Sequence, residues 1–296
     1  MSKTIYILSG ILISVLILFI IISFVFRFLF HKKVTEEIND LIISNKEYDE
    51  KIIRKSDFDD LPDNVRKWLE YSQIIGKEKV NTVRLQQKAE LRLNKDQSWM
   101  PVEAEQYFTT NHPGFIWKAS IKPFPFLHIS GRDKYYKGKG GMLIKVLSLI
   151  TVANSKGKEI DQGTLLRYLA EIVWFPTAAI NDYIQWEELN SSSARATMSY
   201  GGITASGIFN FNKKGEVINF VAERYMEKDD QYELETWSPV MSGYQEINGI
   251  MIPTRGEVIW KLETGDFKWF KFTITDIDYN IDLSKKIKNP ENLSGL

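Results

Sequence analysis

One arginine and one glutamate stand inside an apolar helical segment that follows an acidic, glycine-containing lead-in, and their types and spacing could do chemistry. The segment, residues 159–176, reads EIDQGTLLRYLAEIVWFP. Arg167 and Glu171 are four residues apart, so on a helix they are neighbours and form an ion pair. In water such a pair contributes only about 0.2–0.5 kcal/mol. Inside a hollow, an unpaired buried charge is costly, so each of the two charges stabilises the other. A carboxylate with a shifted pKa in such a place is a candidate for orienting a polar ligand or for transferring protons.

A second carboxylate and two aromatic residues complete the candidate site. Asp133 lies in SGRDKYYKGKGG, and Trp174 and Phe175 follow the helical segment. The chain has 8 tryptophans and 17 phenylalanines, enough to line a wide apolar interior. We interpret Asp133, Arg167 and Glu171 as the residues that orient a polar head group, and Trp174 and Phe175 as residues that line or gate the mouth. The alternatives are a structural ion pair, a carboxylate in a turn and aromatic residues of a filled core.

The helix that carries Arg167 is indicated by an apolar stripe and by its ends. The stripe has helical spacing and consists of Leu165, Leu166, Leu169, Ile172 and Val173. Asp161 or Thr164 is suited to cap the start, and Pro176 ends the helix. We expect this helix to cover the apolar side of a sheet.

Strands dominate the rest of the chain. In TVRLQQKAELRL, residues 82–93, apolar and polar side chains alternate, which is typical of a strand with one wet face. Similar segments recur between turn signals such as Asn248-Gly249, and we expect about eleven strands in antiparallel meanders. Because so many twisted strands must curl or close, the sequence predicts a mainly β (α+β) fold. It is a strongly curved antiparallel half-barrel with an inserted covering helix within residues 148–183.

The N-terminus predicts a membrane anchor. Residues 5–26 carry no charge and span about 33 Å as a helix, which is enough to cross the hydrocarbon core of a bilayer. The run is longer than a signal-peptide core, and no small-residue cleavage site follows it. We therefore expect an uncleaved single-pass anchor. Arg27, Lys32 and Lys33 follow the run and Lys3 precedes it, which slightly favours a cytoplasmic domain.

These elements predict four regions. Residues 1–33 form the transmembrane anchor, and residues 34–80 form a helical stalk and a short packing helix. Residues 81–283 form the half-barrel domain, and residues 284–296 form a flexible tail.

Composition narrows the classes of function. The chain has no cysteine, which excludes disulfides, thiolate metal sites and a lipid-modified cysteine. Residues 1–35 hold four basic and no acidic side chains, while the whole chain has 38 of each. The remainder therefore has an acidic excess of four, which argues against nucleic acid as a partner. Three histidines without close spacing, and GKGG without a following Lys-Ser/Thr, lead us to expect no metal, no cofactor and no assigned catalytic residue.

Five motifs together resemble a bacterial family of membrane-anchored proteins of unknown function. They are DLPDNVRKWL, PGFIWKASI, GRDKYYKGKGGM, GTLLRYLAEIVWFP and WSPVMSGYQEINGIMIP, in this order within residues 60–280. The RYLAE-x-x-WFP block is the most specific of them. The resemblance implies no activity, because the family has none established.

At the level of fold, the strand number and the inserted helix are similar to LolA- and LolB-type lipoprotein carriers. That similarity implies an apolar hollow for acyl chains and an extracytoplasmic domain, against the slight charge bias. LolA is soluble and LolB is held by a lipidated cysteine, whereas this chain has a helical anchor.

The sequence thus predicts a single-pass cell-membrane protein whose half-barrel binds an apolar ligand, either a lipid or the acyl chain of a lipoprotein. The membrane and that ligand are the expected partners. Two alternatives stay open: an envelope hydrolase that uses Glu171 or Asp133, and a non-catalytic scaffold or interaction domain with a filled core.

Overall fold

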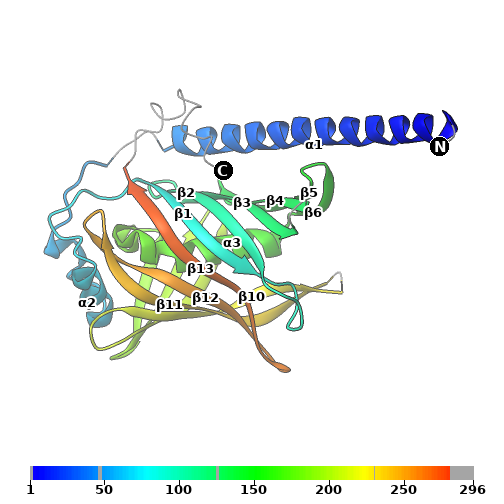
Figure 1. Ribbon diagram of the computed structural model, residues 1–296. Coiled ribbons are helices and arrows are strands. Elements are labelled where there is room, and N and C mark those ends of the chain that lie inside the picture. Colours follow the sequence, from blue (N-terminus) through cyan, green and yellow to red (C-terminus); the bar gives the residue numbers. More distant parts are fainter. Residues whose placement is uncertain (1–2, 46–48, 125–126, 230, 281–296) are drawn as a thin grey trace.

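The structure is a computed structural model that describes residues 3–45, 49–124, 127–229 and 231–280 (Figure 1). The tail predicted over residues 284–296 lies outside these ranges. In chain order the elements are α1 (Lys3–Ile43), η1 (Lys55–Phe58), α2 (Asp63–Tyr71), β1 (Thr82–Leu91), β2 (Met100–Thr109), β3 (Gly114–Phe124), β4 (Leu127–Tyr136), β5 (Lys139–Val146), β6 (Ile150–Ser155), α3 (Lys158–Glu171), η2 (Ile172–Trp174), η3 (Pro176–Ile180), β7 (Ile184–Asn190), β8 (Ser193–Tyr200), β9 (Ile203–Phe211), β10 (Val217–Lys228), β11 (Gln231–Ile247), β12 (Ile250–Leu262) and β13 (Gly265–Tyr279).

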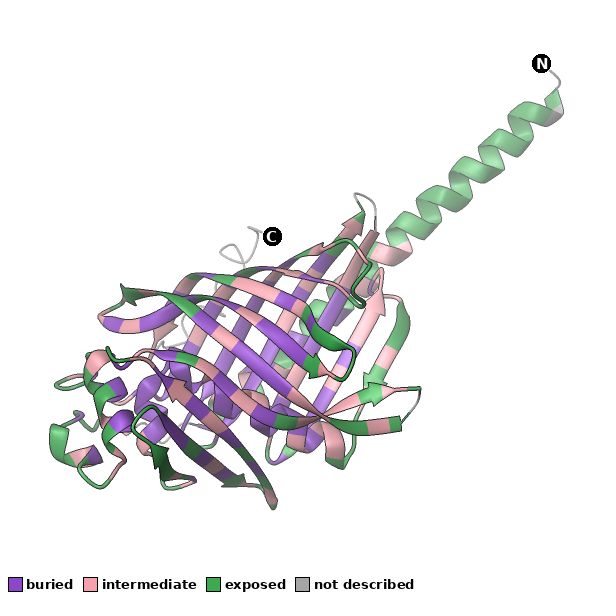
Figure 2. Ribbon diagram, turned by 90° about the horizontal axis from the view of Figure 1, so that it is seen from below, coloured by how far each residue is buried: buried purple, intermediate pink, exposed green. Residues whose placement is uncertain are grey.

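All the described strands belong to one antiparallel sheet, which confirms the predicted half-barrel. The sheet has thirteen strands in the order β6-β5-β4-β3-β2-β1-β13-β12-β11-β10-β9-β8-β7, so β6 and β7 lie at its two edges. The sheet twists and curls strongly across its width (Figure 2). The predicted number of about eleven was too low because short edge strands were missed.

Strand β6 lies in the region where the sequence predicted helical structure from residue 148 onward. This strand is short and lies at an edge of the sheet. Its apolar residues Ile150 and Val152 are exposed, so the alternation of its side chains does not correspond to a buried face and gave no clear strand signal. The helical segment therefore begins at Lys158 and not near residue 148.

The segment α3–η2–η3 runs from edge strand β6 to edge strand β7 across the concave face, where α3 contacts β4, β5 and β8–β10. The predicted apolar stripe is buried, as is Tyr168 on another side of the helix. The helix is thus enclosed from several sides because the sheet curls around it. Asp161 does not cap the helix: its carboxylate accepts a hydrogen bond from Gly140 N at 2.7 Å and pairs with Lys139 at 3.0 Å.

Helix α2 closes one end of the half-barrel. Its Trp68 is fully buried, with ring centroids 6.2 Å from Trp186, 6.0 Å from Phe209 and 6.3 Å from Phe211. Such aromatic clusters fill a large volume with few rotatable bonds. This end is therefore a packed core.

Helix α1 is continuous across the predicted boundary at residue 33. Its N-terminal part is exposed and projects from the domain (Figure 2), and the helix is long and apolar enough to cross a membrane. Its C-terminal part packs on the outer face of the sheet through buried side chains, which are Phe30, Val34, Ile38 and Leu41 on the helix and Tyr107, Ile116 and Leu143 on the strands. Glu37 adds ion pairs to Arg132 at 3.0 Å and to Lys134 at 2.8 Å.

Candidate ligand-binding site

A cavity of about 340 Å³ lies between the C-terminal part of α3 and the concave face of the sheet. Most of its lining is aliphatic or aromatic, with a few polar groups. The lining residues are Gln87, Leu91, Leu93, Trp117, Ile121, Gly131, Asp133, Met142, Ile144, Arg167, Ala170, Glu171, Val173, Trp174, Arg224, Trp237, Pro239, Met241, Val258, Trp269, Phe270 and Phe272. Apolar walls with few polar groups are the usual composition of a small-molecule site, and the volume is at the low end of the roughly 300–1,000 Å³ such sites have.

Arg167 is the centre of a polar network in the wall of this cavity. Its Nε donates to Glu171 Oε1 at 2.8 Å, and its Nη1 donates to Asp133 Oδ2 at 2.9 Å. Its Nη2 donates to Gln106 Oε1 at 3.3 Å, and Gln106 Nε2 donates to the second oxygen of Glu171 at 2.8 Å. The side chains of Arg167 and Glu171 are only 15% and 12% exposed. The pair is therefore largely buried and is held by groups on α3, β2 and β4, unlike a bridge on a helix surface.

Burial changes the acidity of this network. It raises the pKa of Glu171 above the usual 4.5, although the charge of Arg167 and the hydrogen bonds from Arg167 and Gln106 act in the opposite direction. A carboxylate with a raised pKa is a known mark of functional sites, and also of buried structural pairs. Among the described residues, no serine, threonine or histidine side chain hydrogen-bonds to Glu171 or Asp133. The geometry gives no support to a nucleophile activated by either carboxylate.

Arg224, on β10, is a second cation in the cavity wall, and it is differently placed from Arg167. Its side chain forms no ion pair or hydrogen bond with any described residue, and its buried Nε has no acceptor. Its guanidinium lies 4.8 Å from the ring centroid of Trp237 and 5.9 Å from that of Trp260. Burial first, and then the charge of Arg167, lower the pKa of Arg224 to about 10, so it remains a cation at neutral pH.

Two tryptophans of the lining also have buried indole N–H groups without an acceptor in the described part of the chain. They are Trp237 and Trp269. A buried donor that is left unpaired costs roughly 1–3 kcal/mol. With Arg224, three unpaired N–H donors therefore belong to the lining of one apolar cavity.

The structure brings four of the five predicted site residues together. Asp133, Arg167, Glu171 and Trp174 all line the cavity. Trp174 has its polar atoms satisfied, because its Nε1 donates to Pro253 O at 3.2 Å and its carbonyl accepts from Tyr279 Oη at 2.8 Å. Phe175 is not in the lining: it is fully buried, with its ring centroid 4.7 Å from that of Phe108. A role of the four lining residues in ligand binding remains a prediction.

Comparison with known proteins gives the family. The model of a family of unknown function, DUF6544, matches residues 51–272, which is more than half of the chain. The chain belongs to the DUF6544 family. This confirms the resemblance drawn from the RYLAE-x-x-WFP block. Among curated proteins, none is significantly similar to the DUF6544 chain.

Several solved structures are similar to this DUF6544 protein in fold, at low identity. A LolA superfamily protein from Nitrosomonas europaea is 10% identical, with a TM-score of 0.44 over 77% of this chain and 98% of its own. A putative outer membrane lipoprotein-sorting protein domain from Vibrio parahaemolyticus is 10% identical, with a TM-score of 0.41 over 72% and 91%. A DUF1329 family protein from Desulfovibrio piger is 11% identical, with a TM-score of 0.38 over 78% and 98%. The LolA superfamily, expected from strand number and helix insertion, is thus among the similar structures.

Sequence reasoning missed Arg224 and Gln106, although strand parity pointed to both. On β10, Arg224 shares its face with the buried Phe220 and Ala222, and on β2, Gln106 shares its face with the buried Phe108. In an alternating strand, a polar residue at an inward position needs a partner or a ligand. The alternation of these two strands is therefore the sequence signal that identifies both residues in this DUF6544 chain.

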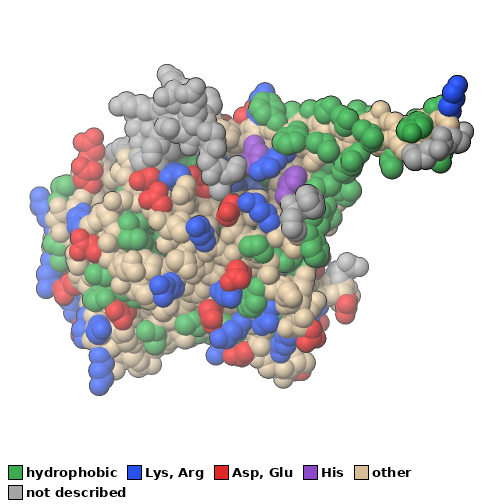
Figure 3. Space-filling model, viewed as in Figure 1, with side chains coloured by type: hydrophobic (Ala, Val, Ile, Leu, Met, Phe, Trp, Pro, Cys, Tyr) green, Lys and Arg blue, Asp and Glu red, His purple; other side chains and the backbone are tan. Residues whose placement is uncertain are grey.

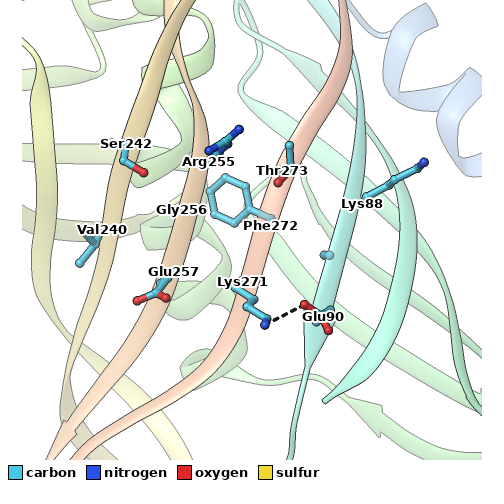
Figure 4. A pocket seen from close by; sticks show the side chains of 11 residues that line it. Lys88, Glu90, Val240, Ser242, Arg255, Gly256, Glu257, Lys271, Phe272 and Thr273 are labelled. Carbon is cyan, nitrogen blue, oxygen red and sulfur yellow. Dashed lines mark ion pairs between the residues drawn. The ribbon is translucent and has the colours of Figure 1, made fainter.

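The same sheet carries a charged groove on its outer face (Figure 4). Its side chains come from β1, β11, β12 and β13, and an ion pair joins Lys271 to Glu90 at 2.8 Å. Lys271 and Glu90 are 39% and 46% exposed, so solvent screens the pair and it contributes little. A solvated surface explains this groove in the DUF6544 chain without a ligand.

Proposed function

We propose that this membrane-anchored protein binds one amphiphile in the cavity beneath α3, with its apolar tail among the aromatic walls and an anionic head group at Arg224. The observation that carries the proposal is the guanidinium of Arg224, which is partly buried in the wall of an apolar cavity and has no ion-pair or hydrogen-bond partner among the described residues. Hydrogen bonds that involve a charged group contribute more than neutral ones, about 1.5–3 kcal/mol each. A carboxylate or phosphate ligand would satisfy Arg224 and offer acceptors to the tryptophan N–H groups.

In this proposal the two arginines have different tasks. Arg167 already contacts Glu171, Asp133 and Gln106, so its charge is compensated and it positions the wall. Arg224 has no such partner among the described residues and is the group that meets the ligand. The tail is the acyl chain of a lipid or of a lipoprotein, because the volume suits one chain better than two.

Quenching of tryptophan fluorescence by a dibrominated fatty acid tests the proposal in the full chain held in detergent. Trp117, Trp174, Trp237 and Trp269 all line the cavity, so a bound bromine quenches them directly. We expect saturable quenching, and we expect Arg224→Met to weaken the affinity by about tenfold or more, the equivalent of about 1.4 kcal/mol.

The matched control is Arg255→Met in the outer groove, which removes one arginine of the same sheet without touching the cavity. The brominated methyl ester, which has no negative charge, should bind wild type and Arg224→Met equally well. Absence of saturable quenching in wild type, or equal loss in both arginine variants, would refute the anionic-head assignment.

For location, we propose a single-pass anchor with the domain on the extracytoplasmic side. The exposed, apolar N-terminal part of α1 supports the anchor. The side of the membrane rests on the sequence prediction alone, and Arg27, Lys32 and Lys33 count against it. Fusions of alkaline phosphatase and of a green fluorescent protein to the C-terminus decide it, since the first is active only outside and the second fluoresces when inside.

A further inference from the structure

The end of the sheet beside the apolar part of α1 has hydrophobic tips. Phe124 at the end of β3 is 69% exposed, and Ile150 and Val152 on β6 are 57% and 58% exposed. In an antiparallel sheet of this order, the C-terminal end of β3 and the β5–β6 turn lie at the same end. Figure 3 shows hydrophobic side chains that continue from α1 onto the adjoining part of the domain. Large exposed apolar groups gathered at one end mark a contact surface.

The position of α1 relative to these tips is set by direct contacts. Ser23 Oγ donates to Leu147 O in the β5–β6 turn at 3.5 Å. Ser23 lies three residues before the end of the uncharged run 5–26, a distance of about 5 Å along a helix. When that run crosses the hydrocarbon core, the turn lies at the level of the membrane surface. The packing of Phe30 and the ion pairs of Glu37 on the sheet hold the helix in this position.

Positive charge surrounds the same place. Arg27, Lys32, Lys33 and Lys145 form no ion pair with any described residue. A cleft of about 690 Å³ between α1 and the β5–β6 edge extends along these strands from Lys145, near their turn, to Lys139 and Lys156 at their far ends. It contains six lysines and one arginine against two acids. Its charged residues are Lys33, Arg132, Lys134, Lys139, Lys145, Lys156, Lys158, Glu37 and Asp161. Basic groups next to a transmembrane helix attract anionic head groups.

We propose that this end of the sheet docks onto the anionic bilayer that α1 spans, with Phe124, Ile150 and Val152 at the boundary of head groups and acyl chains. Aromatic and aliphatic tips surrounded by lysines are what such an interface accommodates. The docking does not depend on what the cavity binds.

Docking also orients the cavity. Leu93, in its lining, is 72% exposed and lies two residues after the end of β1, which runs toward the same end as β3. Ile121 and Ile144, also in the lining, lie a few residues from the docking tips. The open side of the cavity therefore faces the lipid surface, and an amphiphile enters from the bilayer without crossing water.

Single-cysteine labelling tests the docking, because the chain has no native cysteine. Full-length Phe124→Cys, Val152→Cys and Lys214→Cys are labelled with a small environment-sensitive fluorophore and reconstituted into phosphatidylcholine–phosphatidylglycerol vesicles containing spin-labelled lipid. Lys214 is exposed in the β9–β10 turn at the opposite end of the strands. We expect quenching at positions 124 and 152 to exceed that at 214 at least about twofold. Equal quenching at all three positions would overturn the proposal.

A second arm tests the charge. Replacing Lys32, Lys33 and Lys145 together by glutamine should lower quenching at position 124 in anionic vesicles and leave it unchanged in pure phosphatidylcholine. The control replaces Lys213 and Lys214 by glutamine and should change neither. If quenching at position 124 is the same in anionic and neutral vesicles, and is unchanged by the triple substitution, the proposal that the surface recognises anionic lipid is overturned. The fatty-acid assay uses none of these labels, so failure of the cavity proposal is seen separately.

Discussion

The two ends of the half-barrel are both rich in aromatic residues, yet one is solid and the other is hollow. At the closed end α2 packs Trp68 against Trp186 and Phe209, and the rings fill the space. At the opposite end, α3 presents Arg167 and Glu171, and a cavity remains beside them. Aromatic content thus predicts an apolar interior, whereas the covering element decides whether that interior is filled.

The largest expected difference between the two ends comes from deleting a tryptophan at each. Trp68→Ala should lower the free energy of unfolding by about 3–5 kcal/mol, because a fully buried ring is lost and a void is left. Trp269→Ala should cost clearly less, because Trp269 is only partly buried and already borders the cavity. Denaturant unfolding of the full chain in detergent measures both. Equal losses would mean that the two ends are packed alike.

A smaller difference is expected from adding one methyl group at each end. A Cβ at Gly207 would lie 2.0 Å from Cζ of the buried Phe220, whereas one at Gly131 would meet Trp117 and Ala119 at an ordinary 3.7 and 3.9 Å. Gly207→Ala should therefore cost about 1–3 kcal/mol from overpacking. Gly131→Ala should leave the unfolding free energy nearly unchanged, since Gly131 lines the cavity. A strongly destabilised Gly131→Ala would show that the hollow end has no room.

The smallest effect concerns the pH dependence of the hollow end. Because burial raises the pKa of Glu171 in the folded chain, protonated Glu171 favours folding. That contribution is complete below the usual carboxyl pKa and is lost as pH rises through the raised value. Compared with wild type, Glu171→Gln should gain stability with rising pH across that interval. Melting temperatures of both proteins at a series of pH values measure it, and parallel profiles would contradict the shift.

Local sequence patterns are enough to predict the elements and much of the candidate site. An uncharged run longer than a bilayer core requires a helix such as α1, and alternation requires strands. The spacing of Arg167 and Glu171 was sufficient to pair them, since residues four apart on a helix are neighbours whatever the fold. Arg224 was missed, although its parity with Phe220 and Ala222 is a sequence signal for an inward position; alternation alone does not show which inward residues border free space. Phe175 illustrates this limit, because the same apolar character suits a core and a cavity wall.

The folded arrangement of distant segments decides where a cavity remains. It also decides which buried charge has no ion-pair partner among the described residues. The volume of the cavity is the space enclosed by the curled sheet minus the volume of the side chains that fill it. Those side chains come from β1, β3–β5 and β10–β13, which are distant in sequence. Asp133 reaches Arg167 because β4 passes beside α3. Arg224 has no ion-pair partner in the described part of the chain, because no segment packed against β10 there places a carboxylate within ion-pair distance. The proposed docking end likewise depends on the contact between Ser23 of α1 and the β5–β6 turn. The cavity, the partners of the two arginines and the position of α1 all result from contacts between residues that are distant in sequence. Local periodicity does not encode such contacts.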